Sequence, residues 1–157
     1  MSVMQYKLYL RKDTGRTYLR KSRVFDAGEL EVFCRSPDKI YQLMEQYYKL
    51  SEEAEEYVYV ICVNSKCRII GIFELSHGTV SASIVSPRGI FQRALLIGAT
   101  SIVLVHNHPS QDVTPSQDDV QVTHRIYECG KWMNLELLDH IIVGNGYYSF
   151  NESGTLK

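Results

Sequence analysis

The sequence predicts a single α/β domain in which helices pack on a mixed β-sheet. Residues 57–63 and 101–105 are almost entirely β-branched, aliphatic or aromatic, which is typical of strands buried on both faces. Two Ser-Pro pairs, at Ser36-Pro37 and Ser86-Pro87, have the composition of helix starts and separate the strand segments. A chain of 157 residues that is 45% hydrophobic and 22% charged is long enough for one domain with a buried core.

The first half of the chain is predicted to contain one helix followed by three strands. The helix starts at Ser36-Pro37-Asp38, and its apolar residues from Ile40 to Leu50 recur at helical spacing. Residues 57–63 then form a central strand, and residues 68–75 form its antiparallel partner beyond a turn at Asn64-Ser65. A third strand is expected over residues 78–84.

The second half is predicted to alternate helices and strands. A helix begins at Ser86-Pro87 with Ile90, Ala94, Leu95 and Ile97 facing inward, and a buried strand follows at 101–105. After a polar loop at 110–115, a third helix runs from Ser116 to about Cys129 and is stopped by Gly130. Two late strands are expected at 135–143 and 147–150. Helices alternating with buried strands, some joined as hairpins, favour a mixed sheet with helices on it.

Charge divides the chain into two parts. The net charge is −1, but residues 1–23 carry seven basic side chains and one acid, which leaves ten basic and seventeen acidic residues in the remainder. We therefore expect residues 1–35 to form a basic N-terminal strand or hairpin extension and residues 36–157 to form the main domain. The basic side chains can protect an edge strand, or they can contact phosphates or an acidic partner.

Membrane association and export are not expected. No apolar stretch approaches the ~20 residues that span a bilayer, and the N-terminus lacks the regions of a signal peptide. The four cysteines contain no C-x-x-C pair, so zinc-finger spacing is missing. We expect a cytoplasmic protein.

His106 and His108 are the residues with the clearest chemical potential. They lie two apart at the end of a predicted strand, so both imidazoles point to the same side. Asp119, near the start of the next helix, could bring a carboxylate to the same place. Two histidines and one carboxylate leave one tetrahedral position open for water, as in catalytic zinc sites. Alternatively, Ser116 and Asp119 form only a helix-capping pair.

The spacing of these residues resembles a known family. His106-x-His108 followed by Ser116-x-x-Asp119 matches the H-x-H-x(7)-S-x-x-D signature of the JAMM, or MPN-plus, zinc metallopeptidases. The stretches Ser86-Pro87-Arg88, His106 to Ser110, Thr114 to Asp119 and Leu138 to Gly144 are similar to its RadC branch. The resemblance covers residues 36–154.

The resemblance implies a cytidine-deaminase-like three-layer α/β sandwich with one Zn²⁺ per chain, bound by His106, His108 and Asp119. It also implies hydrolysis of peptide or isopeptide bonds by a metal-activated water. A catalytic Glu is expected between the first helix and the next strand. Glu56 occupies that position, with Glu55 and Glu74 as alternatives. Ser116 would stabilise the oxyanion of the reaction.

Some features differ from the family or leave a choice of function. Gln111 stands where relatives usually have Gly, and residues 1–35 are too short and strand-like for the N-terminal helix-hairpin-helix module of many relatives. His140 is expected to be a hydrogen-bonded neighbour of the site, not a ligand.

The expected partner is a peptide or protein substrate. The alternative is a non-hydrolytic protein- or DNA-binding module, for which the basic residues 7–23 are the only argument for nucleic acid. Pairing of edge strands would give a homodimer.

Overall fold

The computed structural model describes residues 2–26, 36–78 and 85–156. Its strands are β1 (Ser2–Leu10), β2 (Thr17–Asp26), β3 (Glu56–Val63), β4 (Ile69–Gly78), β5 (Ser101–Asn107), β6 (Glu136–Gly144) and β7 (Gly146–Ser149). Its helices are α1 (Pro37–Tyr48), α2 (Pro87–Leu96) and α3 (Gln117–Met133), with a short 3₁₀ helix η1 at Leu50–Glu52. Within the described ranges, no helix combines the length and apolar character that crossing a bilayer requires.

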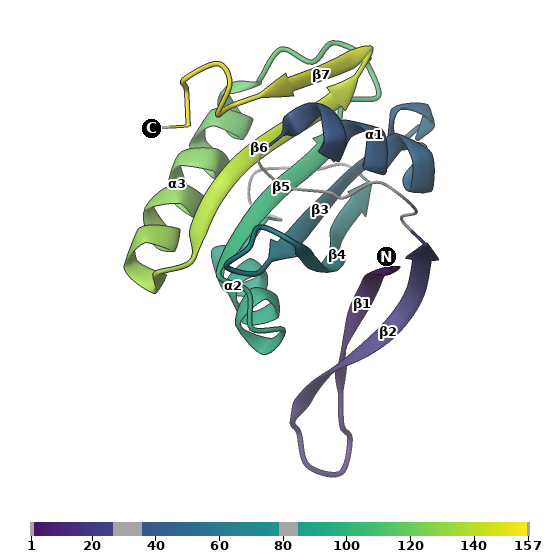
Figure 1. The fold of residues 1–157 in the computed structure, drawn as a ribbon, viewed down its shortest axis with the longest axis vertical. Coiled ribbons are helices and arrows are strands. Elements are labelled where there is room, and N and C mark those ends of the chain that lie inside the picture. Colours follow the sequence, from purple (N-terminus) through teal and green to yellow (C-terminus); the bar gives the residue numbers. More distant parts are fainter. Residues whose placement is uncertain (1, 27–35, 79–84, 157) are drawn as a thin grey trace.

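The described strands form one mixed sheet in the order β2-β1-β4-β3-β5-β6-β7, and helices cover both of its faces (Figure 1). On one face, Leu43 and Met44 of α1 belong to the same buried cluster as Ile61 of β3. Helices α2 and α3 cover the opposite face, where Phe91 and Ile126 belong to a second buried cluster. The predicted three-layer α/β architecture is confirmed.

The central strands bring three strand ends together. β3 and β5 pair antiparallel with Val58 opposite His106, while β5 and β6 pair parallel with His106 beside Ile142. The first residues of β3 therefore lie next to the last residues of β5 and β6. Polar side chains from distant parts of the sequence meet at this end of the sheet.

Helices α1 and α2 begin at the predicted prolines, Pro37 and Pro87, with Ser36 and Ser86 at the N-cap positions. One prediction for α2 is wrong: Leu95 does not face inward but is 54% exposed, because the buried face of this helix passes through Ile90 and Ala94. The third strand expected over 78–84 lies outside the described residues, except for Gly78, which is the last residue of β4.

The predicted end of the third helix is also wrong. Helix α3 continues through Gly130 to Met133 and ends at Asn134, which has a left-handed φ of 51°. Gly130 is buried, and a Cβ atom there would lie 2.6 Å from the carbonyl oxygen of Leu135. The glycine therefore permits the chain to return closely against the helix and does not terminate it.

The basic N-terminal segment forms a twisted β-hairpin at the edge of the sheet. β1 and β2 pair antiparallel along their length, with a register irregularity between Gln5 and Tyr6. β1 also pairs parallel with β4 through Gln5 and Ile72. The hairpin thus extends the sheet of the main domain, and its loop projects beyond the rest of the molecule (Figure 1).

The close contact at Gly130 gives a stability prediction. Gly130→Ala should lower the free energy of unfolding by about 1–3 kcal/mol, because the added methyl group meets a backbone carbonyl that cannot easily move. The matched control is Gly89→Ala in α2, where a Cβ meets only the end of the Arg93 side chain at 3.4 Å. Helix propensity should make the control neutral or stabilising by up to ~1 kcal/mol. Equal effects in denaturant unfolding would contradict this account of Gly130.

Candidate metal centre

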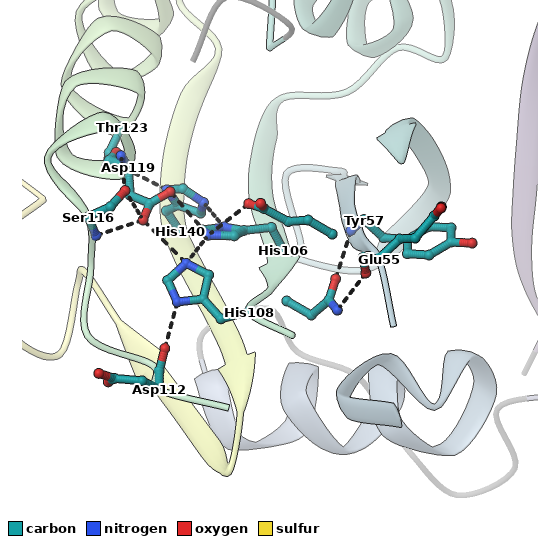
Figure 2. A network of polar contacts seen from close by, with 11 residues as sticks. Glu55, Tyr57, His106, His108, Asp112, Ser116, Asp119, Thr123 and His140 are labelled. Carbon is teal, nitrogen blue, oxygen red and sulfur yellow. Dashed lines mark hydrogen bonds and ion pairs between the residues drawn. The ribbon is translucent and has the colours of Figure 1, made fainter. Parts of the chain in front are cut away.

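Four side chains capable of binding a metal converge where β3, β5 and α3 meet. They are Glu56, His106, His108 and Asp119, and one ligand atom of each lies within 4.8 Å of the others. Glu56 is the first residue of β3, and His106 and His108 lie at and just beyond the end of β5. Asp119 comes from the first turn of α3 (Figure 2). The cluster could hold a metal ion.

The spacing of three of these groups suits one small cation. The Nε2 atoms of His106 and His108 are 3.0 Å apart, and the Asp119 carboxylate lies 3.1 Å from the first and 3.4 Å from the second. Two nitrogens bound tetrahedrally at 2.0–2.1 Å from one zinc ion would be about 3.3 Å apart. Glu56 is farther away, with its Oε1 atom 3.9 Å from Nε2 of His106.

A chain of hydrogen bonds sets the tautomer of His106. The Thr123 hydroxyl donates to the Asp119 carbonyl oxygen at 2.6 Å, so it must accept from Nδ1–H of His140, also at 2.6 Å. Nε2 of His140 is then an acceptor for Nδ1–H of His106 at 2.8 Å. Nε2 of His106 is left with a lone pair directed into the site (Figure 2).

A single hydrogen bond to the backbone orients the imidazole of His108. Its Nδ1 lies 2.6 Å from the carbonyl oxygen of Asp112, which can only accept, so Nδ1 carries the proton. Both Nε2 lone pairs and the Asp119 carboxylate therefore face one point. Such a set of acceptors repels itself unless a proton or a metal cation lies between them, and imidazole nitrogen and carboxylate oxygen are zinc ligands, so the residues present fit a metal ion.

Asp119 performs the capping role and faces the site at the same time. Its Oδ2 atom accepts from the backbone N–H and the hydroxyl of Ser116, at 2.8 and 2.6 Å, and Ser116 Oγ accepts from the backbone N–H of Asp119. This complete capping box fixes the carboxylate, and its Oδ1 atom faces His106. The two interpretations of Ser116 and Asp119 are compatible.

Burial and mutual contacts shift the pKa values of the ionisable groups at the site. Burial opposes ionisation of Asp119, but its contacts with the two imidazoles and Ser116 hold its pKa well below the usual range. The contact with Asp119 raises the pKa of His108. Burial lowers the pKa of His140 far below its ordinary value, which keeps this ring neutral in the hydrogen-bond chain. Burial also raises the pKa of Glu56, so this carboxylate can take up a proton more readily than a free one.

The alternatives to Glu56 lie elsewhere. Glu55 is exposed and contributes its backbone carbonyl, not its carboxylate, to the neighbouring contacts. Glu74 is opposite Tyr59 in the β3–β4 pair, on the face covered by α1, and its carboxylate contacts His77 at 2.9 Å. Among the three glutamates proposed from the sequence, only Glu56 has its carboxylate in the cluster.

Asn107 holds the start of β3 in place, a role that the sequence analysis missed. Its Oδ1 atom accepts from the Tyr57 N–H at 2.7 Å, and its amide donates to the Glu55 carbonyl oxygen at 3.0 Å. Both contacts flank Glu56, so a fully buried side chain on β5 fixes the backbone that carries this carboxylate. A polar residue between two histidines on an otherwise apolar strand was the available signal. Thr123 was missed as well, since nothing in its local sequence indicates a partner.

The loop after His108 is fixed by contacts of Gln111. Gln111 has a φ of 67°, the left-handed region that glycine adopts at least cost. Its side-chain amide donates to the carbonyl oxygen of Ser51 at 2.8 Å, and its backbone carbonyl accepts from Asn145 at 3.1 Å. The loop is therefore attached to η1 and to the β6–β7 turn.

A cavity of about 320 Å³ opens beside the four convergent residues. His106, His108, Asp119 and Glu56 are among its polar lining residues. Its apolar wall consists of Val58, Val85, Leu104 and Val122. Apolar walls with a few convergent polar groups are usual for binding sites of small molecules or side chains.

The fold and the convergent His, Asp and Glu residues define an α/β domain with a candidate metal centre of the JAB type. The RadC-like JAB domain family matches residues 34–155, so the chain belongs to the RadC family. The UPF0758 protein of Clostridium tetani (strain Massachusetts / E88) is 43% identical over 129 residues, covering 82% of this chain and 55% of the relative. The UPF0758 protein of Clostridium botulinum (strain Alaska E43 / Type E3) is 40% identical over 136 residues, covering 86% of this chain and 58% of the relative. The chain thus spans a little over half the length of these relatives.

The hydrogen-bond chain through Thr123 and His140 predicts an effect on metal affinity. Thr123→Val removes the hydroxyl that fixes the His140 tautomer, and affinity for Zn²⁺ should fall about 10–100-fold in titrations against a chromophoric chelator. Thr123→Ser retains the hydroxyl and should bind Zn²⁺ with nearly wild-type affinity. His124→Ala removes an exposed imidazole one position along the same helix and is the control for surface binding. Wild-type affinity for Zn²⁺ in the Thr123→Val variant would contradict the proposed role of these hydrogen bonds.

The contacts of Asn107 predict a loss of stability without direct loss of a ligand. Asn107→Ala leaves the Tyr57 N–H without its partner, which should lower the free energy of unfolding by about 1–3 kcal/mol. Hydrogen exchange of the Tyr57 amide should accelerate more than that of central residues of β3. In the companion variant Asn107→Asp, an acceptor replaces the donor that faces the Glu55 carbonyl, so the loss should be larger. A stability within 0.5 kcal/mol of wild type, a limit on the scale of ordinary surface substitutions, would rule out this role.

Proposed function

We propose that this chain is a zinc-dependent hydrolase of peptide or isopeptide bonds. The observation that carries the proposal is the convergence of two imidazole Nε2 atoms and one carboxylate, with a second carboxylate 3.9 Å from Nε2 of His106. Membership of a JAB-domain family supports it. A bound zinc ion would lower the pKa of a water molecule and polarise the substrate carbonyl.

The residues of this chain have separate roles in the proposal. His106, His108 and Asp119 hold the ion, and the capping box and the Thr123–His140 contacts hold these ligands in place. Glu56 accepts a proton from the attacking water and later donates it to the leaving amine. Its raised pKa, caused mainly by burial, suits a group that must hold the proton between these steps.

Ser116 is proposed to act mainly by orienting Asp119. Its hydroxyl donates to Oδ2 of Asp119 at 2.6 Å, so the same proton is not available to an oxyanion unless that bond opens. The hydroxyl does line the cavity, which is the position that the family resemblance assigns to an oxyanion donor. Stabilisation of the oxyanion by Ser116 therefore stays a prediction.

The apolar wall of the cavity indicates the part of a substrate that would fit. Val58, Val85, Leu104 and Val122 offer no hydrogen-bonding side chains next to the candidate metal ligands. A peptide with an aliphatic side chain beside the scissile bond would bury that side chain against them. We propose such peptides as the first substrates to be tested.

Glu56 gives the most direct test of the mechanism. Glu56→Gln should reduce hydrolysis of a fluorogenic peptide library by about 10²–10⁴-fold, because the amide cannot accept the proton. Metal content, measured by mass spectrometry on the native protein, should remain about one zinc ion per chain. His106→Ala should instead lose the metal as well as the activity.

The sequence supplies matched controls for this test. Glu55→Gln and Glu74→Gln make the same chemical change beside the site and on the opposite sheet face, and both should remain active. Hydrolysis that survives both Glu56→Gln and Asp119→Asn would refute the mechanism. A wild-type protein without zinc, whose metal content is unchanged by His106→Ala, would refute the metal site itself.

A further inference from the structure

A strongly basic hairpin stands apart from the candidate metal centre. The hairpin of β1 and β2 contains seven basic side chains and one acid within residues 1–23, while the remainder of the chain has ten basic and seventeen acidic residues. The basic side chains are all exposed. No residue of the hairpin lines the cavity at the metal centre, so any role of this surface is independent of the proposed hydrolysis.

The register of the hairpin places most of these cations on one face. Residues opposite each other in an antiparallel pair share a face, and Lys7 is opposite Arg20 as Tyr9 is opposite Tyr18. Arg23 pairs with Gln5, two residues before Lys7, and extends the same face. We call the surface of Lys7, Tyr9, Arg11, Tyr18, Arg20 and Arg23 the basic face.

Aromatic rings on this face hold the guanidinium groups in place. The guanidinium carbon of Arg20 lies 5.9 Å from the ring centre of Tyr9, and that of Arg11 lies 5.9 Å from the ring centre of Tyr18. The two tyrosine rings stack with centroids 5.8 Å apart. Cations ordered in this way lose less conformational entropy on binding than free side chains do.

We propose that the basic face binds the phosphate backbone of a nucleic acid. A two-stranded β-ribbon fits the major groove of duplex DNA, and a twisted ribbon can follow it. The register irregularity at Gln5 and Tyr6 leaves Ser22 without a partner residue, which is the arrangement of a β-bulge and increases the local twist. Two further cations, Lys12 and Arg16, lie with Arg11 at the loop.

Protection of the sheet edge explains these charges incompletely. Charged side chains on β2, the edge strand, would hinder pairing with another chain. Arg11, Lys12 and Arg16, however, lie in the loop and not on β2. Edge protection requires none of these three cations.

The aliphatic residues near the hairpin loop lie away from the basic face, which argues against a membrane as the partner. Leu8 pairs with Leu19, and Leu10 pairs with Thr17, which places these side chains on the face opposite to the basic one. A surface that binds an anionic bilayer usually presents apolar and basic groups to the same side.

Fluorescence anisotropy with a labelled 20-base-pair duplex and a single strand of equal length tests the proposal. The full chain should bind duplex DNA with an affinity that falls steeply with salt, and six phosphate contacts correspond to a slope of log K against log [NaCl] of about −5. The triple variant K7Q/R20Q/R23Q should bind at least tenfold more weakly at 50 mM NaCl. Its slope should be shallower by about 2.7, since each contact contributes about 0.9.

A second variant and a matched control make the outcome decisive. K39Q/K66Q/K131Q removes the same charge from exposed sites outside the hairpin and should bind within threefold of wild type. R11Q/K12Q/R16Q changes only the loop and should lower the slope as the first triple variant does, which separates binding from any damage to strand pairing. The proposal fails if both hairpin variants bind like the control, if no duplex or single strand binds at 50 mM NaCl, or if vesicles containing phosphatidylserine bind more tightly than DNA.

Discussion

The antiparallel pairing of β3 with β5 is the constraint on which the candidate metal centre depends. With Val58 opposite His106, the first residue of β3 lies beside the histidines, although fifty positions separate Glu56 from His106. A slip of one residue would turn Glu56 toward the face covered by α1, because side chains alternate between faces. The buried core residues of β3 resist such a slip along the length of the strand. Asn107 fixes the start of β3, with one hydrogen bond on each side of Glu56.

The second constraint is electrostatic. Lone pairs and carboxylate oxygens directed at one point destabilise a folded protein unless a cation compensates them. The surrounding hydrogen bonds favour this arrangement over the alternatives: Nδ1 of His108 is occupied by a backbone carbonyl, and Nδ1 of His106 by a neutral, buried His140. Neither imidazole can turn its protonated nitrogen inward without losing a short hydrogen bond. A bound cation would therefore add to the stability of the fold.

Local patterns predicted those features that depend on neighbours in the sequence. The buried strands, the Pro37 and Pro87 helix starts and the common side of His106 and His108 follow from composition and from a period of two. Features that depend on tertiary contacts were predicted incorrectly or missed. Gly130 has the composition of a helix stop, and only the approach of the Leu135 carbonyl shows why the helix continues. Thr123 belongs to the site through a ring on β6, a contact that no local pattern encodes.

The hairpin both completes the sheet and carries the cationic surface. β1 covers the edge of β4 that would otherwise be open, so the N-terminal residues serve the sheet even though the family match begins only at residue 34. A short neutral strand would cover that edge equally well. The hairpin instead continues beyond the sheet and carries cations ordered by Tyr9 and Tyr18, while the body that contains the candidate metal centre has an acidic excess. Attraction within the chain alone would draw these cations toward the acidic body. Their separation on a projecting ribbon leaves the cationic charge accessible, as binding to an external polyanion requires.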